Sequence, residues 1–93
     1  MNLSAATPPA VTVYVSDWCP YCMRAKDLLA RKNLAFSEIN VEDEPKFREE
    51  MIARSNRRTV PQIFIGDKHV GGCDDLFELD RSGELDRLIQ GAR

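Results

Sequence analysis

The sequence predicts one α/β domain, a small mixed sheet of four strands with helices on both faces, in the order β-α-β-α-β-β-α. Three observations indicate this class: a strand–helix–strand pattern in the first half of the chain, a hairpin pattern in the second half, and a length of 93 residues, which suits one modest core. The first pattern is typical of parallel strands joined by a right-handed crossover, and a hairpin adds an antiparallel pair. We place the domain at residues 11–93, after a flexible leader at residues 1–10.

The first half of the chain supplies a strand, a helix and a second strand. Residues 11–16 are β-branched and apolar, as in a strand that is buried on both faces. Pro20 suits the first turn of a helix, where its missing N–H costs nothing, and Asn33 is a plausible end. The inner face of this helix consists of residues at helical spacing, namely Ala25, Leu28, Leu29 and Lys32. Residues 35–41 alternate apolar and polar types, as in a second strand.

A second helix is predicted to open at Glu44-Pro45. Its start is acidic and its end is basic, as the helix dipole favours, with Arg54, Arg57 and Arg58 forming the basic end. Its apolar stripe consists of Phe47, Met51 and Ile52.

The last third of the chain predicts a hairpin and a final helix. Residues 61–65 and 68–70 have strand patterns, and the Gly-Asp pair at residues 66–67 between them is typical of a tight turn. One of the two aspartates at residues 74–75 can cap the final helix, which the Ser-Gly pair at residues 82–83 interrupts.

The charge and hydropathy of the chain argue against several classes of partner. A formal net charge of −2 provides no basic field for nucleic acid or an anionic membrane. No apolar run approaches the roughly 18 residues that a membrane span needs. Residues 1–10 lack the cationic start and the long apolar stretch of a secretory signal. We therefore expect a protein that binds neither nucleic acid nor membrane. Three cysteines are too few for a disulfide framework, so we expect it to be cytoplasmic, and we expect a monomer.

Two cysteines separated by two residues, Cys19 and Cys22, are the strongest chemical signal. Together with His69 and Cys73 they supply four formal zinc ligands, but the two pairs lie too far apart in sequence for a zinc finger. A purely structural disulfide would close a ring too small to remove much entropy from the unfolded chain. A reversible redox pair beside a strand–helix–strand pattern is the favoured interpretation, so no metal is expected.

Helix geometry supports the redox interpretation. Residues three apart on an α-helix have Cα atoms about 5 Å apart, within the roughly 4.4–6.8 Å range of disulfides. Cys19 would occupy the N-cap of the predicted helix, where free backbone N–H groups favour a thiolate. Cys22 would lie one turn inside, without those free amides. We therefore expect Cys19 to be the nucleophile and Cys22 the resolving thiol.

Three blocks of the sequence together resemble the glutaredoxins of the dithiol CPYC type, close to the small bacterial members. The blocks are Cys19-Pro20-Tyr21-Cys22, Thr59-Val60-Pro61 and Gly71-Gly72-Cys73-Asp74-Asp75. Their order and spacing fit the family over essentially everything after the first ten residues. The resemblance implies a thioredoxin-like (glutaredoxin) fold and glutathione-dependent thiol–disulfide exchange.

The resemblance also implies where glutathione would bind. In the family the proline of the second block is cis and faces the cysteines, so the backbone of Val60 would pair with the cysteine of a bound peptide. The third block would receive the γ-glutamyl end, and Arg57 matches the position that contacts the glycyl carboxylate. The expected glutathione-binding set is Tyr21, Arg57, Thr59, Val60, Pro61, Gly72, Cys73 and Asp74, with Cys19 and Cys22 as the catalytic pair.

The sequence departs from the family just before the first cysteine. Ser16 stands where many members carry a lysine, and the neighbouring Asp17 is acidic. This removes a cation that would favour the thiolate and the glycyl carboxylate. Trp18 is a choice typical of thioredoxins, and an exposed indole suits protein docking. Cys73 is expected to be a small residue packed beneath the site, and a regulatory thiol is the alternative.

The expected function is reduction of protein–glutathione mixed disulfides by Cys19 alone and of protein disulfides by Cys19 with Cys22. Glutathione is the expected reductant, and the partners are glutathionylated or disulfide-containing proteins. Two alternatives stay open at this point. One is a thioredoxin-like electron carrier recharged by a flavoprotein reductase, and the other is a non-enzymatic iron–sulfur cluster carrier with Cys19 as a ligand.

Overall fold

The computed structural model describes residues 9–90, so residues 1–8 of the predicted leader and residues 91–93 lie outside it. The first seven elements follow the predicted order, and an eighth, α4, comes after them: β1 Val11–Val15, α1 Pro20–Arg31, β2 Ser37–Asn40, α2 Pro45–Ser55, β3 Gln62–Ile65, β4 Lys68–Gly71, α3 Cys73–Arg81 and α4 Glu84–Gln90. Within these residues no helix is long and apolar enough to cross a membrane.

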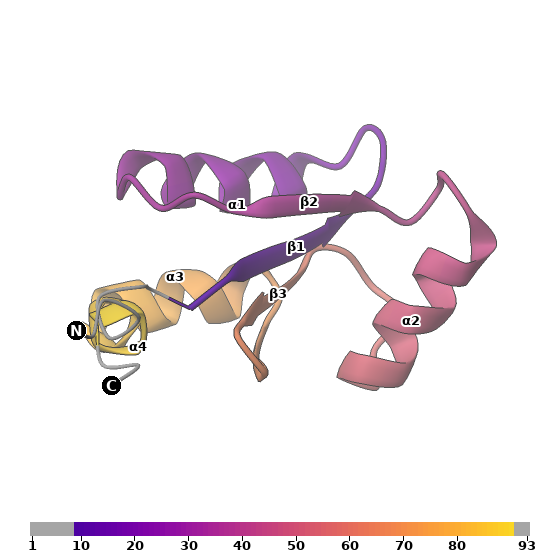
Figure 1. The fold of residues 1–93 in the computed structure, drawn as a ribbon. Coiled ribbons are helices and arrows are strands. Elements are labelled where there is room, and N and C mark those ends of the chain that lie inside the picture. Colours follow the sequence, from indigo (N-terminus) through magenta and orange to yellow (C-terminus); the bar gives the residue numbers. More distant parts are fainter. Residues whose placement is uncertain (1–8, 91–93) are drawn as a thin grey trace.

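The predicted mixed sheet is confirmed, with the strand order β2-β1-β3-β4 (Figure 1). β1 runs parallel to β2 and antiparallel to β3, and β3 pairs antiparallel with β4. Val15 lies opposite Asn40, and Tyr14 lies opposite Gln62. The carboxyl ends of β1, β2 and β4 and the amino end of β3 therefore lie at one edge of the sheet.

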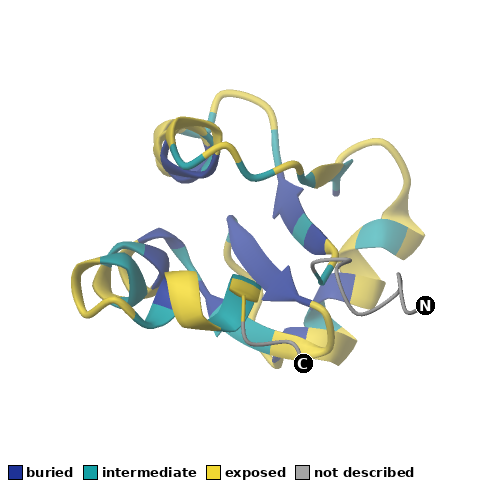
Figure 2. Ribbon diagram, turned by 60° about the vertical axis from the view of Figure 1, so that its left-hand side comes forward, coloured by how far each residue is buried: buried dark blue, intermediate teal, exposed yellow. Residues whose placement is uncertain are grey.

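Helices cover both faces of the sheet, as predicted. On one face, Val13, Ile63 and their alternate neighbours pack with buried residues of α1, α3 and α4. On the other face, Tyr14 and Phe64 pack against Met51 of α2. Because side chains alternate along a strand, β1 and β3 contribute to both cores, and Figure 2 shows both strands buried along nearly all of their length.

Polar contacts hold α2 on its face. The Tyr14 hydroxyl donates to the Glu50 carboxylate and accepts a hydrogen bond from Arg54 at 2.9 Å. The Arg54 guanidinium also lies 4.1 Å from the centre of the Phe64 ring, within the range of a cation–π contact. Burial is the main cause that raises the pKa of Tyr14, so the phenol stays protonated and donates.

Two helix ends differ from the sequence prediction. Arg57 and Arg58 lie beyond α2, because Asn56 takes a left-handed conformation with φ 62° and ends the helix there. Arg54 alone remains in the last turn. The predicted interruption at residues 82–83 is complete and separates two helices, α3 and α4, with Gly83 at φ 83° between them.

The packing of α3 on the sheet is tested by Leu76→Ala. Leu76 is fully buried in the core that contains the cysteine pair, so its truncation should cost about 2–5 kcal/mol of unfolding free energy. Leu79→Ala on the same helix is the matched control, because Leu79 is only partly buried and should cost less. Urea unfolding measures both. Equal losses would contradict this account of the core.

Candidate active site

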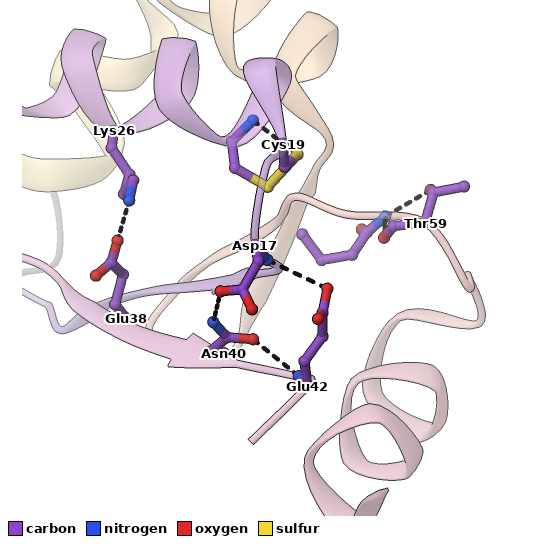
Figure 3. Close-up of a disulfide and its surroundings, with 9 residues drawn as sticks. Asp17, Cys19, Lys26, Glu38, Asn40, Glu42 and Thr59 are labelled. Carbon is purple, nitrogen blue, oxygen red and sulfur yellow. Dashed lines mark hydrogen bonds and ion pairs between the residues drawn. A yellow bond between two sulfur atoms is a disulfide. The ribbon is translucent and has the colours of Figure 1, made fainter. Parts of the chain in front are cut away.

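Cys19 and Cys22 form a disulfide at the start of α1 (Figure 3). Their Cα atoms are 5.2 Å apart, as helix geometry predicted. Cys19 is the N-cap in an extended conformation, and Pro20 occupies the first turn. The backbone N–H of Cys22 donates to the Cys19 sulfur at 3.1 Å. The N-cap position thus places a free helix amide against this sulfur.

The two sulfurs differ in accessibility. Cys22 is 1% exposed and lies on the buried face of α1, within the core, whereas Cys19 is partly buried and packs against that core. A substrate can therefore reach Cys19 but not Cys22. This asymmetry is the arrangement expected for a nucleophile and a resolving thiol.

Four segments distant in sequence meet at the edge of the sheet where the disulfide lies. The disulfide follows the end of β1, and Glu42 and Asp43 follow the end of β2. The Thr59–Pro61 block precedes β3, and Gly72 follows β4. The strand directions make this convergence obligatory, because all four of these junctions lie at the same edge.

The Val60-Pro61 peptide bond is cis, as the resemblance implied. Val60 packs against both cores, and Cys19 packs against the core that contains Cys22. Among residues 9–90, no hydrogen bond uses the backbone N–H or C=O of Val60. The backbone of Val60 is therefore free to pair with an added peptide strand.

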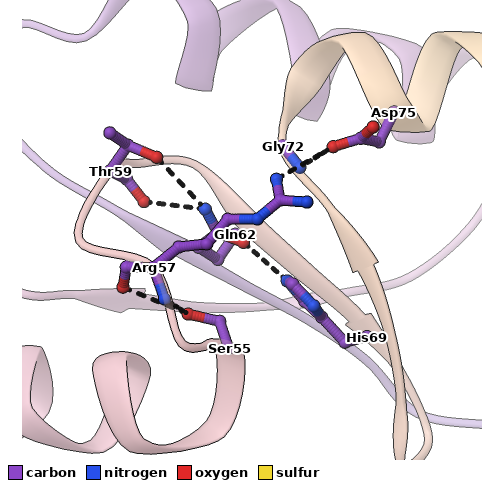
Figure 4. Close-up of polar contacts among 7 residues, drawn as sticks. All are labelled: Ser55, Arg57, Thr59, Gln62, His69, Gly72 and Asp75. Carbon is purple, nitrogen blue, oxygen red and sulfur yellow. Dashed lines mark hydrogen bonds and ion pairs between the residues drawn. The ribbon is translucent and has the colours of Figure 1, made fainter.

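A buried amide supports the Thr59–Pro61 block from below (Figure 4). Gln62 has no exposed surface, and its side-chain nitrogen donates to the Thr59 carbonyl at 3.0 Å. The His69 Nε2 lies 2.6 Å from the Gln62 Oε1. Because that oxygen can only accept, His69 donates through Nε2. Burial, and next Arg57, lower the pKa of His69, and Asp75 opposes them.

Arg57 and Asp75 form an ion pair across the site, with the Arg57 Nη1 3.1 Å from the Asp75 Oδ2 (Figure 4). The same carboxylate oxygen accepts the backbone N–H of Gly72 at 2.9 Å. This backbone bond is the main cause that lowers the pKa of Asp75, with Arg57 adding to it. Asp75 thus ties the end of β4 to the loop that follows α2.

The first residues of α3 partly correct the sequence prediction. The N-cap is Gly72, so neither Asp74 nor Asp75 has that position. Asp75 is the third helical residue and caps through its side chain, while the side chain of Asp74 is exposed and makes no hydrogen bond within residues 9–90. Cys73 is buried in the same core as Cys22, and burial raises the pKa of its thiol.

The structure adds residues that the sequence analysis did not assign to the site. Asp75 and Gln62 hold the two loops, and Asn40 and Glu42 contact Asp17 beside the disulfide (Figure 3). Glycine is a common N-cap residue, and an acid three residues later can accept the N-cap N–H as in one half of a capping box, so Asp75 had a usable signal. Gln62 had none, because its partners lie on a loop and on another strand.

Tyr21 lies on the first turn of α1 beside the disulfide and is 55% exposed. Among the described residues, no group of three or more His, Cys, Asp or Glu side chains is placed to hold a metal ion. His69, one of the four formal zinc ligands, instead bonds to Gln62.

Comparison with known proteins gives consistent matches. A family model described as Glutaredoxin matches residues 11–70. A glutaredoxin of Pseudomonas aeruginosa is 52% identical over 81 residues, covering 87% of this chain and 96% of that protein. Glutaredoxin 3 of Escherichia coli is 52% identical over 80 residues, covering 86% of this chain and 96% of that protein.

Two solved structures are similar in fold. The solution structure of a glutaredoxin from Brucella melitensis matches with a TM-score of 0.79 and 51% identity, covering 94% of this chain and 96% of that one. A crystal structure of a buckwheat glutaredoxin–glutathione complex matches with a TM-score of 0.81 and 30% identity, covering 94% of this chain and 81% of that one.

Gly71→Ala should disturb the contact between β4 and Asp75. Gly71 has φ 122°, and an added methyl group would overlap the Asp75 carboxylate. The variant should lose at least about 1–2 kcal/mol of stability from backbone strain alone. Gly83→Ala is the control, because Gly83 has φ 83° with no atom within 4 Å of the added carbon. Urea unfolding should show the larger loss for Gly71→Ala; the reverse order would contradict this reading.

His69 should make stability depend on pH. Its pKa in the folded state is below its ordinary value of 6.5, so the unfolded chain binds the proton more tightly. Stability from this group is therefore complete above that ordinary value. The contribution of His69 to stability falls as the pH drops below 6.5, and it stops falling below the pKa of the folded state. His69→Gln removes the titrating group. Urea unfolding from about pH 8 to pH 5 should show a steeper decline in the parent chain than in the variant; parallel curves would refute the assignment.

Proposed function

The chain belongs to the glutaredoxin family and is a glutathione-dependent thiol–disulfide oxidoreductase, and on this premise we propose that Cys19 and Cys22 are its redox pair. The asymmetric disulfide supports this most directly. The accessible sulfur lies at a helix N-terminus and faces the Cys22 amide, and its partner is buried one turn inside the helix. The same amide would stabilise a Cys19 thiolate after reduction.

With a protein–glutathione mixed disulfide, Cys19 works alone. Its thiolate attacks the glutathione sulfur, an S–S bond to Cys19 forms, and the bond to the protein substrate breaks. The released thiolate takes a proton from water. A second glutathione thiolate then attacks the bound glutathione sulfur, which regenerates the Cys19 thiolate and yields glutathione disulfide. The glutathione disulfide thus contains one glutathione from the substrate and one from solution, and the exchange balances.

With a protein disulfide, Cys22 completes the reaction. Attack by Cys19 leaves a mixed disulfide with the substrate. Cys22 then loses its proton, attacks the Cys19 sulfur and releases the second substrate thiolate. The Cα separation of 5.2 Å allows this bond to form without refolding α1. Two glutathione molecules reduce the resulting bridge.

Glutathione is proposed to bind between the Thr59–Pro61 block and the start of α3. The backbone of Val60 would pair with its cysteinyl residue as an added strand does. The backbone N–H groups of Cys73 and Asp74 have no partner within residues 9–90, and at a helix N-terminus they suit the γ-glutamyl carboxylate. The exposed Asp74 carboxylate suits the ammonium group of the same end.

The remaining contacts proposed for glutathione lie on either side of this backbone. Arg57 keeps donors beyond the one used by Asp75, and they suit the glycyl carboxylate. Tyr21, Thr59, Pro61 and Gly72 complete the proposed lining. Because all of these residues come from one chain, we also propose that a monomer is active. The cytosol is the proposed compartment, because its glutathione pool is kept reduced.

Single cysteine variants separate the two reactions. Cys22→Ser should keep at least about half of the turnover of a glutathione–cysteine mixed disulfide but lose reduction of protein disulfides. Cys19→Ser should lose both by at least about a hundredfold, because it removes the nucleophile. Coupled assays with glutathione and glutathione reductase measure both rates.

Two results would contradict this mechanism. Loss of mixed-disulfide turnover in Cys22→Ser would refute the route that uses Cys19 alone. Failure of glutathione by itself to reduce the Cys19–Cys22 bridge would favour a carrier recharged by a flavoprotein reductase.

A further inference from the structure

A groove of about 400 Å³ opens on the β2 side of the disulfide. Its lining includes both cysteines, the Val15–Trp18 segment that follows β1, and Met23 and Lys26 of α1. Glu38, Asn40 and Asp43 line it from β2 and the turn that follows. A molecule in this groove would therefore lie directly against the disulfide.

The groove shares only the two cysteines with the proposed glutathione site. In the sheet order β2-β1-β3-β4, the glutathione site lies toward β3 and β4, and the groove lies between β1 and β2. Glutathione and a second molecule can thus approach Cys19 from opposite sides. A protein–glutathione mixed disulfide has two parts, the glutathionyl group and the protein, and each part could approach Cys19 from one of these sides.

The charge of the groove is negative. Lys26 is neutralised by an ion pair with Glu38. Within residues 9–90, Asp17, Glu42 and Asp43 form no ion pair with a Lys, Arg or His. Asp17 and Asp43 line the groove, and Glu42 adjoins it through its hydrogen bond with Asp17. We call these three carboxylates the acidic wall of the groove. Glutathione has two carboxylates and one ammonium group, so the acidic wall repels it and attracts a basic segment.

Part of the acidic wall is fixed before any partner binds (Figure 3). The Asn40 side-chain nitrogen donates to the Asp17 carboxylate at 2.9 Å, and the Glu42 N–H donates to the Asn40 side-chain oxygen at 2.8 Å. The Asp17 N–H donates to the Glu42 carboxylate at 3.2 Å. Three side chains from two segments thus hold two carboxylates beside Cys19, which reduces the entropy lost on binding.

The groove also has an apolar rim. Trp18 is 97% exposed with φ 53°, and Met23 is 63% exposed, although both adjoin the disulfide. Large exposed apolar side chains beside a reactive group are typical of interaction surfaces, and Trp is enriched among the residues that dominate binding energy.

We infer that this groove binds the segment of a protein substrate that flanks its reactive cysteine, and that it selects segments carrying lysine or arginine next to that cysteine. The inference rests on the proposed function, in which glutathione occupies the opposite side of Cys19. Trp18 and Met23 contact the apolar part of the segment, and the acidic wall pairs with its basic side chains. The groove is thus a specificity determinant for the substrate protein.

The test uses two synthetic peptides with a single glutathionylated cysteine, identical except for Lys or Glu on both sides of it. The parent protein should turn over the Lys peptide with a kcat/KM at least about tenfold higher at low salt. This ratio should shrink toward one at about 0.5 M salt, where charges are screened. A ratio near one at low salt would overturn the inference.

Asp43→Lys is the critical variant, because the Asp43 side chain makes no hydrogen bond within the described residues, so the substitution leaves the Asp17–Asn40–Glu42 network in place. It should lower the Lys-to-Glu ratio at least about threefold. Asp67→Lys, in the exposed turn between β3 and β4, makes the same change in net charge away from the groove and should leave the ratio unchanged. An equal effect of both variants, or none from Asp43→Lys, would refute the inference.

A small substrate separates failure of the groove from failure of the proposed function. The mixed disulfide of glutathione and cysteine is too small to contact the whole groove. Turnover of this substrate without discrimination between the peptides would refute the groove alone. No glutathione-dependent turnover of this substrate would refute the proposed function. Trp18→Ala should reduce turnover of both peptides more than turnover of the small substrate, and an equal reduction would contradict the role of Trp18.

Discussion

The start of α1 is the constraint on which the site depends. With Cys19 as the N-cap and Pro20 in the first turn, the Cys22 amide faces the Cys19 sulfur, and both sulfurs lie within bonding distance. The same geometry buries Cys22 and leaves Cys19 at the edge of the core. The difference in exposure between the two sulfurs, on which the proposed roles of nucleophile and resolving thiol rest, therefore follows from one turn of helix placed over a packed face of the sheet.

The sheet places different segments on the two sides of the Cys19–Cys22 disulfide. Because β1 is an inner strand, the disulfide at its end has β2 on one side and β3 with β4 on the other. The β3 side provides the Val60 backbone, the start of α3 and Arg57. The β2 side provides carboxylates and an exposed indole. Ser16 and Asp17, where the sequence departs from the family pattern, thus lie on the side away from the proposed glutathione site.

Residues that need not touch a substrate hold both sides in place. Gln62 supports the Thr59–Pro61 block, and Asp75 connects Gly72 to Arg57. Asn40 does the same for Asp17 on the β2 side. Each is a polar group on or next to a strand of the sheet, and its hydrogen bonds hold a neighbouring loop in a fixed position relative to the sheet.

The sequence by itself determined the fold class, the order of the elements and the position of the cysteine pair at the start of a helix, because hydrophobic periodicity, Pro20 and the cysteine spacing are local signals. Tertiary structure alone decided the partners of Arg57, the roles of Gln62 and Asp75, and the groove beside Asp17. Those features depend on which strand ends meet at one edge of the sheet. Periodicity reveals which face of a strand is buried, but not which distant side chain lies across from it.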